Sequence, residues 1–453
     1  MPDYTYHPDL ARYAHMKSTL SPWFVRLSHG PMKLLYAAQQ SGDRVRVSRL
    51  SVPRSDGSCL RMLLYAPAGC EGETPCVYFL HGGGFVFNAA PHHFALAGEL
   101  ARALGVRVAL PDYRLAPRHT FPAAHEDALT GYRWLWENAA ALRIDPARIA
   151  AAGDSAGGNL AAALCLMARE QRLPMPCAQM LLYPVLDARM ETESYRQFTD
   201  TPMCSSRDME KYFAMYAPDT SAAPREWLSP AESASLQGLP GAYIETAEFD
   251  CLRDEGAQYA AHLAREGVPC EYHPIKNAMH GYDIAVNSEF LRPVMAYRIE
   301  FLRKVLREDK EVQQHRVHNA EQNPGQHLNG RMADKFLELN VRQLAGGELV
   351  KRADDLVDDG GLLAGLEPDA HRVLADDHGE HRGDGKLKGV EPVDECRSHR
   401  ERGNGRGVAA RHAAVADKPG EIEPVRDERV DDRFEHLRPQ PRRNAGQQKL
   451  VGN

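Results

Sequence analysis

The stretch AAAGDSAGGNL, residues 150–160, decides the fold of this chain. It contains Gly153-x-Ser155-x-Gly157, a pattern of small residues that lets a serine lie on a sharp turn between a strand and a helix. The apolar run 148–152 predicts a buried strand before the turn, and the Ala- and Leu-rich run 160–170 predicts a helix after it. We expect a strained backbone at the serine, because the turn is sharp. Glycine is needed two residues before and two residues after it, because side chains there would collide across the turn.

Strand and helix patterns alternate on both sides of this turn. Residues 44–47 and 60–65 predict half-exposed antiparallel strands. Apolar runs predict buried strands at 76–80, 106–110, 179–184, 242–247 and 270–275. Helical patterns occur at 94–104, 122–138, 255–266 and 291–307. This order predicts an α/β fold: a mostly parallel central sheet with helices on both faces and an antiparallel edge.

Two polar segments predict helices outside the sheet. Residues 1–45 have the spacing of two short amphipathic helices, broken at Pro22 and at Gly30-Pro31. Residues 187–224 are polar with scattered aromatic side chains and predict further short helices. We interpret both segments as a helical cap that packs on the main domain, residues 46–307, and covers part of a site.

Residues 308–453 differ sharply in composition from the rest of the chain. They contain no Trp or Tyr, and their aromatic residues are Phe336 and Phe434. Charged residues, histidine and glycine dominate, so the segment cannot bury enough apolar surface to offset its ordering entropy. We predict a disordered tail or non-native extension that is not part of the folded enzyme.

Composition excludes several classes of partner. The formal net charge is −7, and the arginines of the tail are interleaved with acids, so no nucleic-acid partner is expected. The nine cysteines lack metal-site spacing, which favours reduced thiols and no metal. The first residues lack the pattern of a signal peptide, and no apolar run could span a bilayer. We therefore expect a cytoplasmic protein with a small-molecule partner; the sequence is compatible with a monomer or a homodimer.

A serine hydroxyl becomes a nucleophile only beside a general base that a third group orients. On a strand–turn–helix scaffold those partners are expected in the order Ser, Asp or Glu, His, in loops after later strands. Asp250 follows the predicted strand 242–247, and His280 follows the strand 270–275. We predict Ser155 as nucleophile, His280 as base and Asp250 as its orienting acid.

Competing residues fit this order less well. They are Asp254, a helix-cap candidate; Asp283, too close in sequence to His280; and His273, inside a strand. The alternative stays open that Asp250 is a surface acid and His280 is a loop histidine, neither with a catalytic role.

The loop His81-Gly82-Gly83-Gly84 follows a central strand and has almost no side chains. Its amides can approach a developing oxyanion, as can the amide of Ala156 at the start of the helix after Ser155. We predict Gly82, Gly83, Gly84 and Ala156 as an oxyanion hole, with His81 supporting the loop. A phosphate cradle is disfavoured because no Lys-Ser/Thr pair follows the glycines.

Together these motifs resemble the hormone-sensitive-lipase family of bacterial carboxylesterases. The matching motifs are His81-Gly-Gly-Gly84, Pro111-Asp-Tyr-Arg-Leu-Ala-Pro117, Gly153-Asp-Ser-Ala-Gly-Gly158, Asp250-x-Leu-Arg-Asp254-Glu255-Gly256 and His280-Gly281. The resemblance covers about residues 1–307. It implies an α/β-hydrolase fold with a helical cap, and cofactor-free hydrolysis of short- to medium-chain acyl esters by the residues named above.

The chain departs from the family pattern beside the predicted acid. Cys251 stands where the family usually has proline, which removes a rigid residue and predicts a looser loop at Asp250. We interpret residues 112–114 as structural and expect the acyl pocket to include Phe213 and Tyr216.

Two alternative functions use the same fold. One is an amide or lactone hydrolase with the same machinery; the other is a ligand receptor. Receptors that resemble this family lack the histidine that corresponds to the predicted base, whereas this chain retains it as His280. If His280 is the base, activity is expected to fall as it protonates in the mildly acidic range.

Truncation after residue 308 tests the interpretation of the tail. Because the predicted core and site are complete before this point, the shortened chain should keep the melting temperature and p-nitrophenyl acetate turnover of the full chain. A large loss of either quantity would show that the tail belongs to the enzyme.

Overall fold

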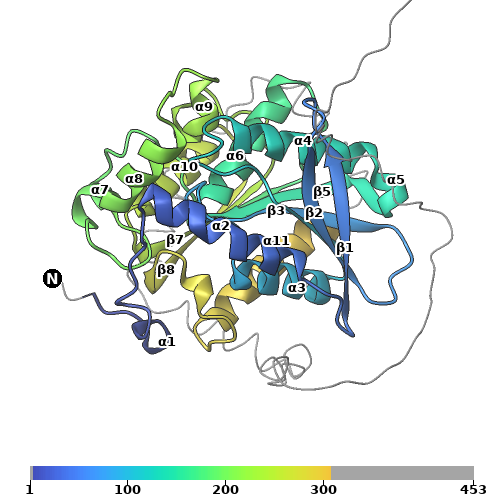
Figure 1. Ribbon diagram of the computed structural model, residues 1–453, viewed down its shortest axis with the longest axis horizontal. Helices are drawn as coiled ribbons and strands as arrows, with labels where there is room; N and C mark the ends of the chain where they lie inside the picture. Colours follow the sequence, from blue (N-terminus) through green and yellow to red (C-terminus); the bar gives the residue numbers. More distant parts are fainter. Residues whose placement is uncertain (1–3, 308–453) are drawn as a thin grey trace, which may run out of the picture. The chain divides into compact units, whose positions relative to one another are not determined.

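One eight-stranded sheet forms the centre of residues 4–307, which the computed structural model describes (Figure 1). The strands are β1 (Val45–Pro53), β2 (Cys59–Pro67), β3 (Thr74–Leu80), β4 (Arg107–Pro111), β5 (Ile144–Asp154), β6 (Gln179–Leu182), β7 (Ala242–Phe249) and β8 (Cys270–Met279). Their spatial order is β1-β2-β4-β3-β5-β6-β7-β8. The tail predicted at 308–453 lies outside the described residues.

Strand pairing confirms the predicted α/β class. The pairs β1/β2 and β2/β4 are antiparallel. The pairs β4/β3, β3/β5, β5/β6, β6/β7 and β7/β8 are parallel. The parallel strands therefore bring their carboxyl ends, and the loops that follow them, to one edge of the sheet.

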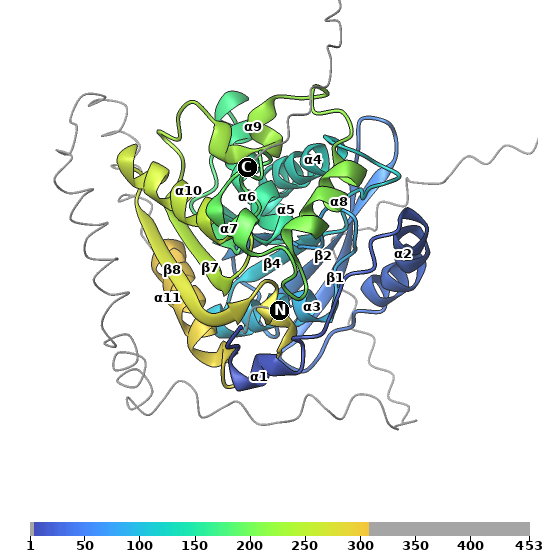
Figure 2. The same cartoon turned by 90° about the vertical axis from the view of Figure 1, so that its left-hand side faces the viewer.

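Helices cover both faces of the sheet. The helices of residues 4–307 are α1 (Pro8–Ala11), α2 (Pro22–Ala37), α3 (Pro91–Leu104), α4 (Ala123–Glu137), α5 (Ala139–Leu142), α6 (Ala156–Glu170), α7 (Glu193–Gln197), α8 (Ser206–Tyr216), α9 (Arg225–Leu228), α10 (Arg253–Arg265) and α11 (Leu291–Arg307), with 3-10 turns η1 (Pro230–Glu232) and η2 (Tyr282–Ile284). Helices α4, α6 and α10 lie on one face, and α3 and α11 lie on the other (Figures 1 and 2).

The alternation of side chains along β5 explains the two layers. Ala151 packs into the apolar cluster on the side of α4, α6 and α10, whereas Ala150 and Ala152 pack into the cluster on the side of α3 and α11. Successive side chains of a strand point to opposite faces, so a continuous apolar run is what a doubly covered strand requires.

The turn between β5 and α6 has the strained geometry that the sequence predicts. Ser155 has φ 53° and ψ −119°, a left-handed backbone that residues with a side chain rarely adopt. A Cβ at Gly153 would collide with the carbonyl of Gly157, and one at Gly157 would collide with the carbonyl of Leu80 in β3. This turn, which we call the β5–α6 elbow, thus packs directly on β3, the strand that precedes the His81–Gly84 loop.

The N-terminal arm differs from the prediction in two ways. Only residues 8–11 of its first segment form a helix, and α2 continues through Gly30-Pro31, which we expected to end it. Proline removes one hydrogen bond, to the carbonyl of Leu27, from the ladder of the helix. Because Leu27, Gly30 and Pro31 are all exposed, water can replace that bond and the helix continues.

The arm and the segment 187–224 contact each other. The Met203 amide donates to the carbonyl of Met16 at 3.1 Å, and the Ser18 hydroxyl donates to the carbonyl of Met203 at 3.0 Å. The rings of Tyr4 and Phe198 lie 5.9 Å apart. That these segments act together as a cap stays a prediction.

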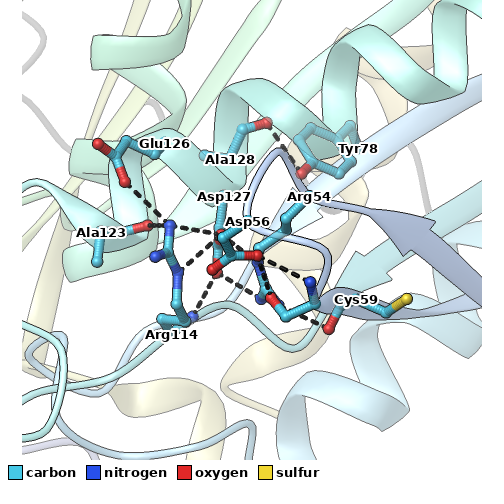
Figure 3. A network of polar contacts seen from close by, with 10 residues as sticks. Arg54, Asp56, Cys59, Tyr78, Arg114, Ala123, Glu126, Asp127 and Ala128 are labelled. Carbon is cyan, nitrogen blue, oxygen red and sulfur yellow. Dashed lines mark hydrogen bonds and ion pairs between the residues drawn. The ribbon is translucent and has the colours of Figure 1, made fainter. Parts of the chain in front are cut away.

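Asp127 in α4 fixes the loop 111–117 beside the candidate site (Figure 3). Its carboxylate accepts hydrogen bonds from Arg54 Nε at 2.7 Å and from the amide and Nε of Arg114 at 2.8 and 3.0 Å. The preceding residue of the loop, Tyr113, donates its hydroxyl to the carbonyl of His81 at 2.7 Å. These contacts match the structural role expected of residues 112–114.

Candidate active site

Three predicted residues meet at the carboxyl edge of the sheet. Ser155 Oγ lies 2.8 Å from His280 Nε2, and His280 Nδ1 lies 2.7 Å from Asp250 Oδ2. Ser155 sits between β5 and α6, Asp250 directly follows β7, and His280 directly follows β8. All three are buried. The strands therefore place one hydroxyl, one imidazole and one carboxylate in a continuous hydrogen-bonded line.

The loop at Asp250 is held without the proline that the family usually has. The amide of Leu252 donates to Asp250 Oδ1 at 3.0 Å, and the Ser194 hydroxyl donates to the carbonyl of Cys251 at 2.7 Å. Cys251 itself is fully buried. The segment before β7 thus supplies a bond that holds this loop, while a loosening by the loss of proline stays a prediction.

The rival acids and the rival histidine have other partners. Asp283 pairs with Arg298 at 2.6 Å, inside the protein. Asp254 accepts a hydrogen bond from the Ser194 amide at 2.8 Å, and the ring of His273 stacks on Tyr243. The structure brings none of these groups to Ser155.

The pairing with Asp250 changes the proton affinity of His280. Burial is the largest influence and lowers the pKa of His280, because it disfavours the charged ring. The Asp250 carboxylate opposes burial through its charge and its hydrogen bond, and smaller contributions from other groups act in the same direction. The net result raises the pKa of His280 from 6.5 to about 9.

Backbone amides surround the space next to Ser155. Gly83 and Gly84 have φ of 111° and 60°, values that favour glycine, and a Cβ would collide with Phe87 at the first position and with Tyr212 at the second. Their amides and that of Ala156 make no hydrogen bond within residues 4–307. Such unpaired N–H groups, one of them at a helix N-terminus, are suited to hold an anionic oxygen.

Gly82 has a different task from the predicted one. Its amide already donates to Asp154 Oδ1 at 2.8 Å, so it cannot also serve as an oxyanion donor. A Cβ at Gly82 would collide with the same carboxylate. The predicted set of four donors therefore reduces to Gly83, Gly84 and Ala156, while Gly82 ties the loop to the elbow.

Asp154 and His93 were not predicted from the sequence as parts of the site. His93 Nε2 lies 3.2 Å from Asp154 Oδ2, and the Ala90 amide donates to His93 Nδ1 at 2.8 Å. Burial raises the pKa of Asp154, but the histidines beside it outweigh this and hold the pKa below its usual range. An ionised Asp154 thus links the residue before Ser155 to Gly82. The only sequence signal was its position between Gly153 and Ser155.

His81 supports the loop through packing. Its ring stacks on Tyr113 with centroids 4.2 Å apart, and its Nδ1 lies 2.7 Å from the carbonyl of Gly82. Burial lowers the pKa of His81 to about 4, so the ring is neutral and donates from Nδ1. This agrees with the supporting role predicted for it.

One group of side chains beside the site has metal-ligand chemistry. One ligand atom each from His92, His93 and Asp154 lies within 4.8 Å of the others. However, the Ala90 amide occupies His93 Nδ1 as an acceptor, so the ring proton resides on Nε2 and points at Asp154. A cation at that nitrogen would have to displace this proton, so a hydrogen-bonded cluster is the better description.

Helix α8 brings one aromatic side chain close to the glycine loop. A Cβ at Gly84 would collide with the ring of Tyr212 in α8, which shows how closely this ring approaches. Tyr216, which we expected in the acyl pocket, instead stacks on Phe85 at 4.1 Å and is hydrogen-bonded to His125. Its prediction is wrong because these buried partners hold it in the core; Phe213 stays a prediction.

The chain is similar to known ester hydrolases. Residues 77–284 match a family model described as an alpha/beta hydrolase fold. Carboxylesterase NlhH of Mycobacterium tuberculosis is 33% identical over 275 residues, which are 60% of this chain and 85% of that protein. Ethyl acetate hydrolase of Pseudomonas putida is 35% identical over 243 residues, or 52% of this chain and 75% of that protein.

Solved structures agree with the sequence comparisons. The structure of a bacterial heroin esterase superposes with a TM-score of 0.62 at 32% identity, and the match covers 67% of this chain and 99% of that one. Esterase LipW of Mycobacterium marinum gives a TM-score of 0.62 at 29% identity, over 67% of this chain and 97% of that chain.

Titration of the histidine rings by NMR tests the electrostatics of the site. We expect His280 to titrate above 6.5, towards 9, because Asp250 stabilises its protonated form. In Asp250→Asn the opposing effect of burial remains, so the midpoint should fall below 6.5. His125, whose pKa burial lowers to about 4, is the internal control and should not titrate near neutrality. A midpoint for His280 at or below 6.5 in the parent would contradict this assignment.

Proposed function

This chain belongs to the hormone-sensitive-lipase-like esterases of the α/β-hydrolase family and is a carboxylic ester hydrolase, and we propose that it acts through an acyl-enzyme intermediate on Ser155. The proposed substrates are esters of short- to medium-chain acids. Proposed roles are Ser155 as nucleophile, His280 as general base and acid, and Asp250 as the group that orients His280.

One observation carries this proposal: the hydrogen-bonded line from Ser155 through His280 to Asp250. Its distances, 2.8 and 2.7 Å, are those of direct hydrogen bonds, and a proton can pass between Oγ and Nε2 without rearrangement. Because Nδ1 donates to Asp250, Nε2 of the neutral ring is an acceptor, which is the tautomer that a general base needs.

The first half of the proposed reaction forms the acyl-enzyme. Ser155 Oγ attacks the ester carbonyl carbon while its proton passes to His280 Nε2. The carbonyl oxygen gains the electron pair of the opened π bond, and the amides of Gly83, Gly84 and Ala156 stabilise its charge. The intermediate then collapses, the carbon–oxygen bond to the alcohol breaks, and His280 returns the proton to the leaving oxygen.

The second half releases the acid. A water molecule attacks the acyl carbon and gives its proton to His280. Collapse of the second tetrahedral intermediate breaks the bond to Ser155 Oγ, which recovers the proton. Asp250 keeps its negative charge throughout and stabilises the imidazolium in both halves. Every proposed step uses only groups of this chain, the ester and water.

The pH range of the reaction needs a correction to the expectation from sequence. An ordinary histidine would lose its base function in the mildly acidic range, but pairing with Asp250 raises the pKa of His280 to about 9. The ring is a base only above its pKa, so activity is expected to rise with pH between 6.5 and about 9.

The proposal is tested with p-nitrophenyl esters of increasing chain length and the variant Ser155→Ala. The parent should hydrolyse acetate to octanoate esters best, and the variant should lose at least about 10⁴-fold in kcat/KM, because the attacking oxygen is gone. An anilide analogue of the best ester measures the alternative amidase activity and should react far more slowly.

Ser221→Ala is the matched control, since that hydroxyl is exposed and its contact is with Asp219. It should retain parental kinetics. Undiminished turnover by Ser155→Ala would refute the nucleophile assignment, and a preference for the longest esters would refute the chain-length assignment.

A further inference from the structure

The outward face of α2 is apolar, which is unusual for a surface helix. Trp23, Leu27 and Leu34 are 72%, 59% and 72% exposed, the largest values among the large apolar side chains of residues 4–307. At 100° per residue they lie within about 40° of one another around the helix axis. We call these three side chains the α2 ridge.

The opposite face of α2 already packs on the protein. Val25 and Tyr36 are buried in the two apolar clusters of the core. His29 Nε2 is hydrogen-bonded to the carbonyl of Val86 at 2.6 Å. Figure 2 shows α2 at one side of the molecule. The ridge therefore does not belong to the core, and an exposed ridge of this kind marks an interaction surface.

The segment of the chain that carries the ridge is basic. Residues 10–42 contain no Asp or Glu, although the chain as a whole has a net charge of −7. Their basic residues are Arg12, Lys17, Arg26 and Lys33, and all four are exposed. On the helix, Arg26 and Lys33 share one flank, about 80–100° from the centre of the ridge.

We propose that the α2 ridge docks on an anionic phospholipid surface. A helix with exposed Trp and Leu on one side and basic residues beside them lies in the interface of a bilayer, with its apolar side chains at the boundary of the headgroups and acyl chains. Arg26 and Lys33 then meet the lipid phosphates, and each basic residue near such a surface adds to the attraction.

The charge pattern also favours this occupant over a second copy of the chain. Two copies whose α2 helices met antiparallel through their ridges would bring the cationic flanks together, and this like-charge contact is unfavourable. α2 has 16 residues, and no helix of residues 4–307 is long and apolar enough to cross a membrane, so the proposed mode is docking on the surface.

Docking would bring the candidate site close to the lipid. Val86, which α2 contacts through His29, is two residues after Gly84 in the loop proposed to hold the oxyanion. The proposal goes beyond the ester hydrolysis proposed above and does not depend on it, because membrane binding is measured without a substrate.

Vesicle co-sedimentation with the full chain tests the proposal. The probes are vesicles of phosphatidylcholine alone and vesicles in which a quarter of the lipid is phosphatidylglycerol. The parent should bind the anionic vesicles, with tryptophan fluorescence shifted to the blue, and binding should weaken with salt. The triple variant Trp23→Ser, Leu27→Ser, Leu34→Ser should lose at least about tenfold in partitioning. Arg26→Glu with Lys33→Glu should reduce binding to the anionic vesicles selectively.

Trp136→Ser is the matched control, because Trp136 is 39% exposed on α4, away from the ridge. It should bind like the parent, and every variant should keep the parental melting temperature, because all the substituted side chains are exposed. If the full chain does not bind the anionic vesicles, the proposal is overturned. This holds also if a second copy or the tail covers the ridge. Equal binding by the triple variant, or a lower mass of this variant in light scattering, would overturn it as well.

Discussion

The close approach of the β5–α6 elbow to the end of β3 is the constraint on which the rest of the structure depends. No atom beyond hydrogen fits on Gly157 where it faces the Leu80 carbonyl, or on Gly153 where it faces Gly157. Contacts this tight leave one arrangement of the two strand ends. They fix the position of the Ser155 hydroxyl relative to the loop that starts at His81, so backbone packing sets the positions of the proposed nucleophile and the proposed oxyanion donors.

Two buried carboxylates extend this constraint in opposite directions. Asp154 lies next to Ser155 in the chain, but its side chain points back to the glycine loop, where it holds the Gly82 amide. Asp250 lies two strands away and acts on Ser155 only through His280. One acid therefore holds the loop proposed to bind the oxyanion, and the other raises the pKa of the proposed base, His280.

Much of this arrangement was predictable because it is encoded locally. Steric limits on glycine define the elbow and the His81–Gly84 loop, and the order of strands places Asp250 and His280 at the same sheet edge. What the sequence could not reveal depends on partners distant in the chain. The bond from Gly82 to Asp154 spans 72 residues, and that between His125 and Tyr216 spans 91. The continuation of α2 through Pro31 likewise depends on the exposure of that turn, which only the fold determines.

Ser155 is proposed as the residue that becomes acylated, and covalent labelling measures this without a substrate. The full chain is treated with a fluorophosphonate, which reacts with activated serine nucleophiles, and the labelled peptide is identified by mass spectrometry. One label per chain is expected, on Ser155, and little labelling is expected in His280→Gln, because the hydroxyl then lacks its base. A label on another residue, or an unlabelled chain that still hydrolyses esters, would contradict this assignment.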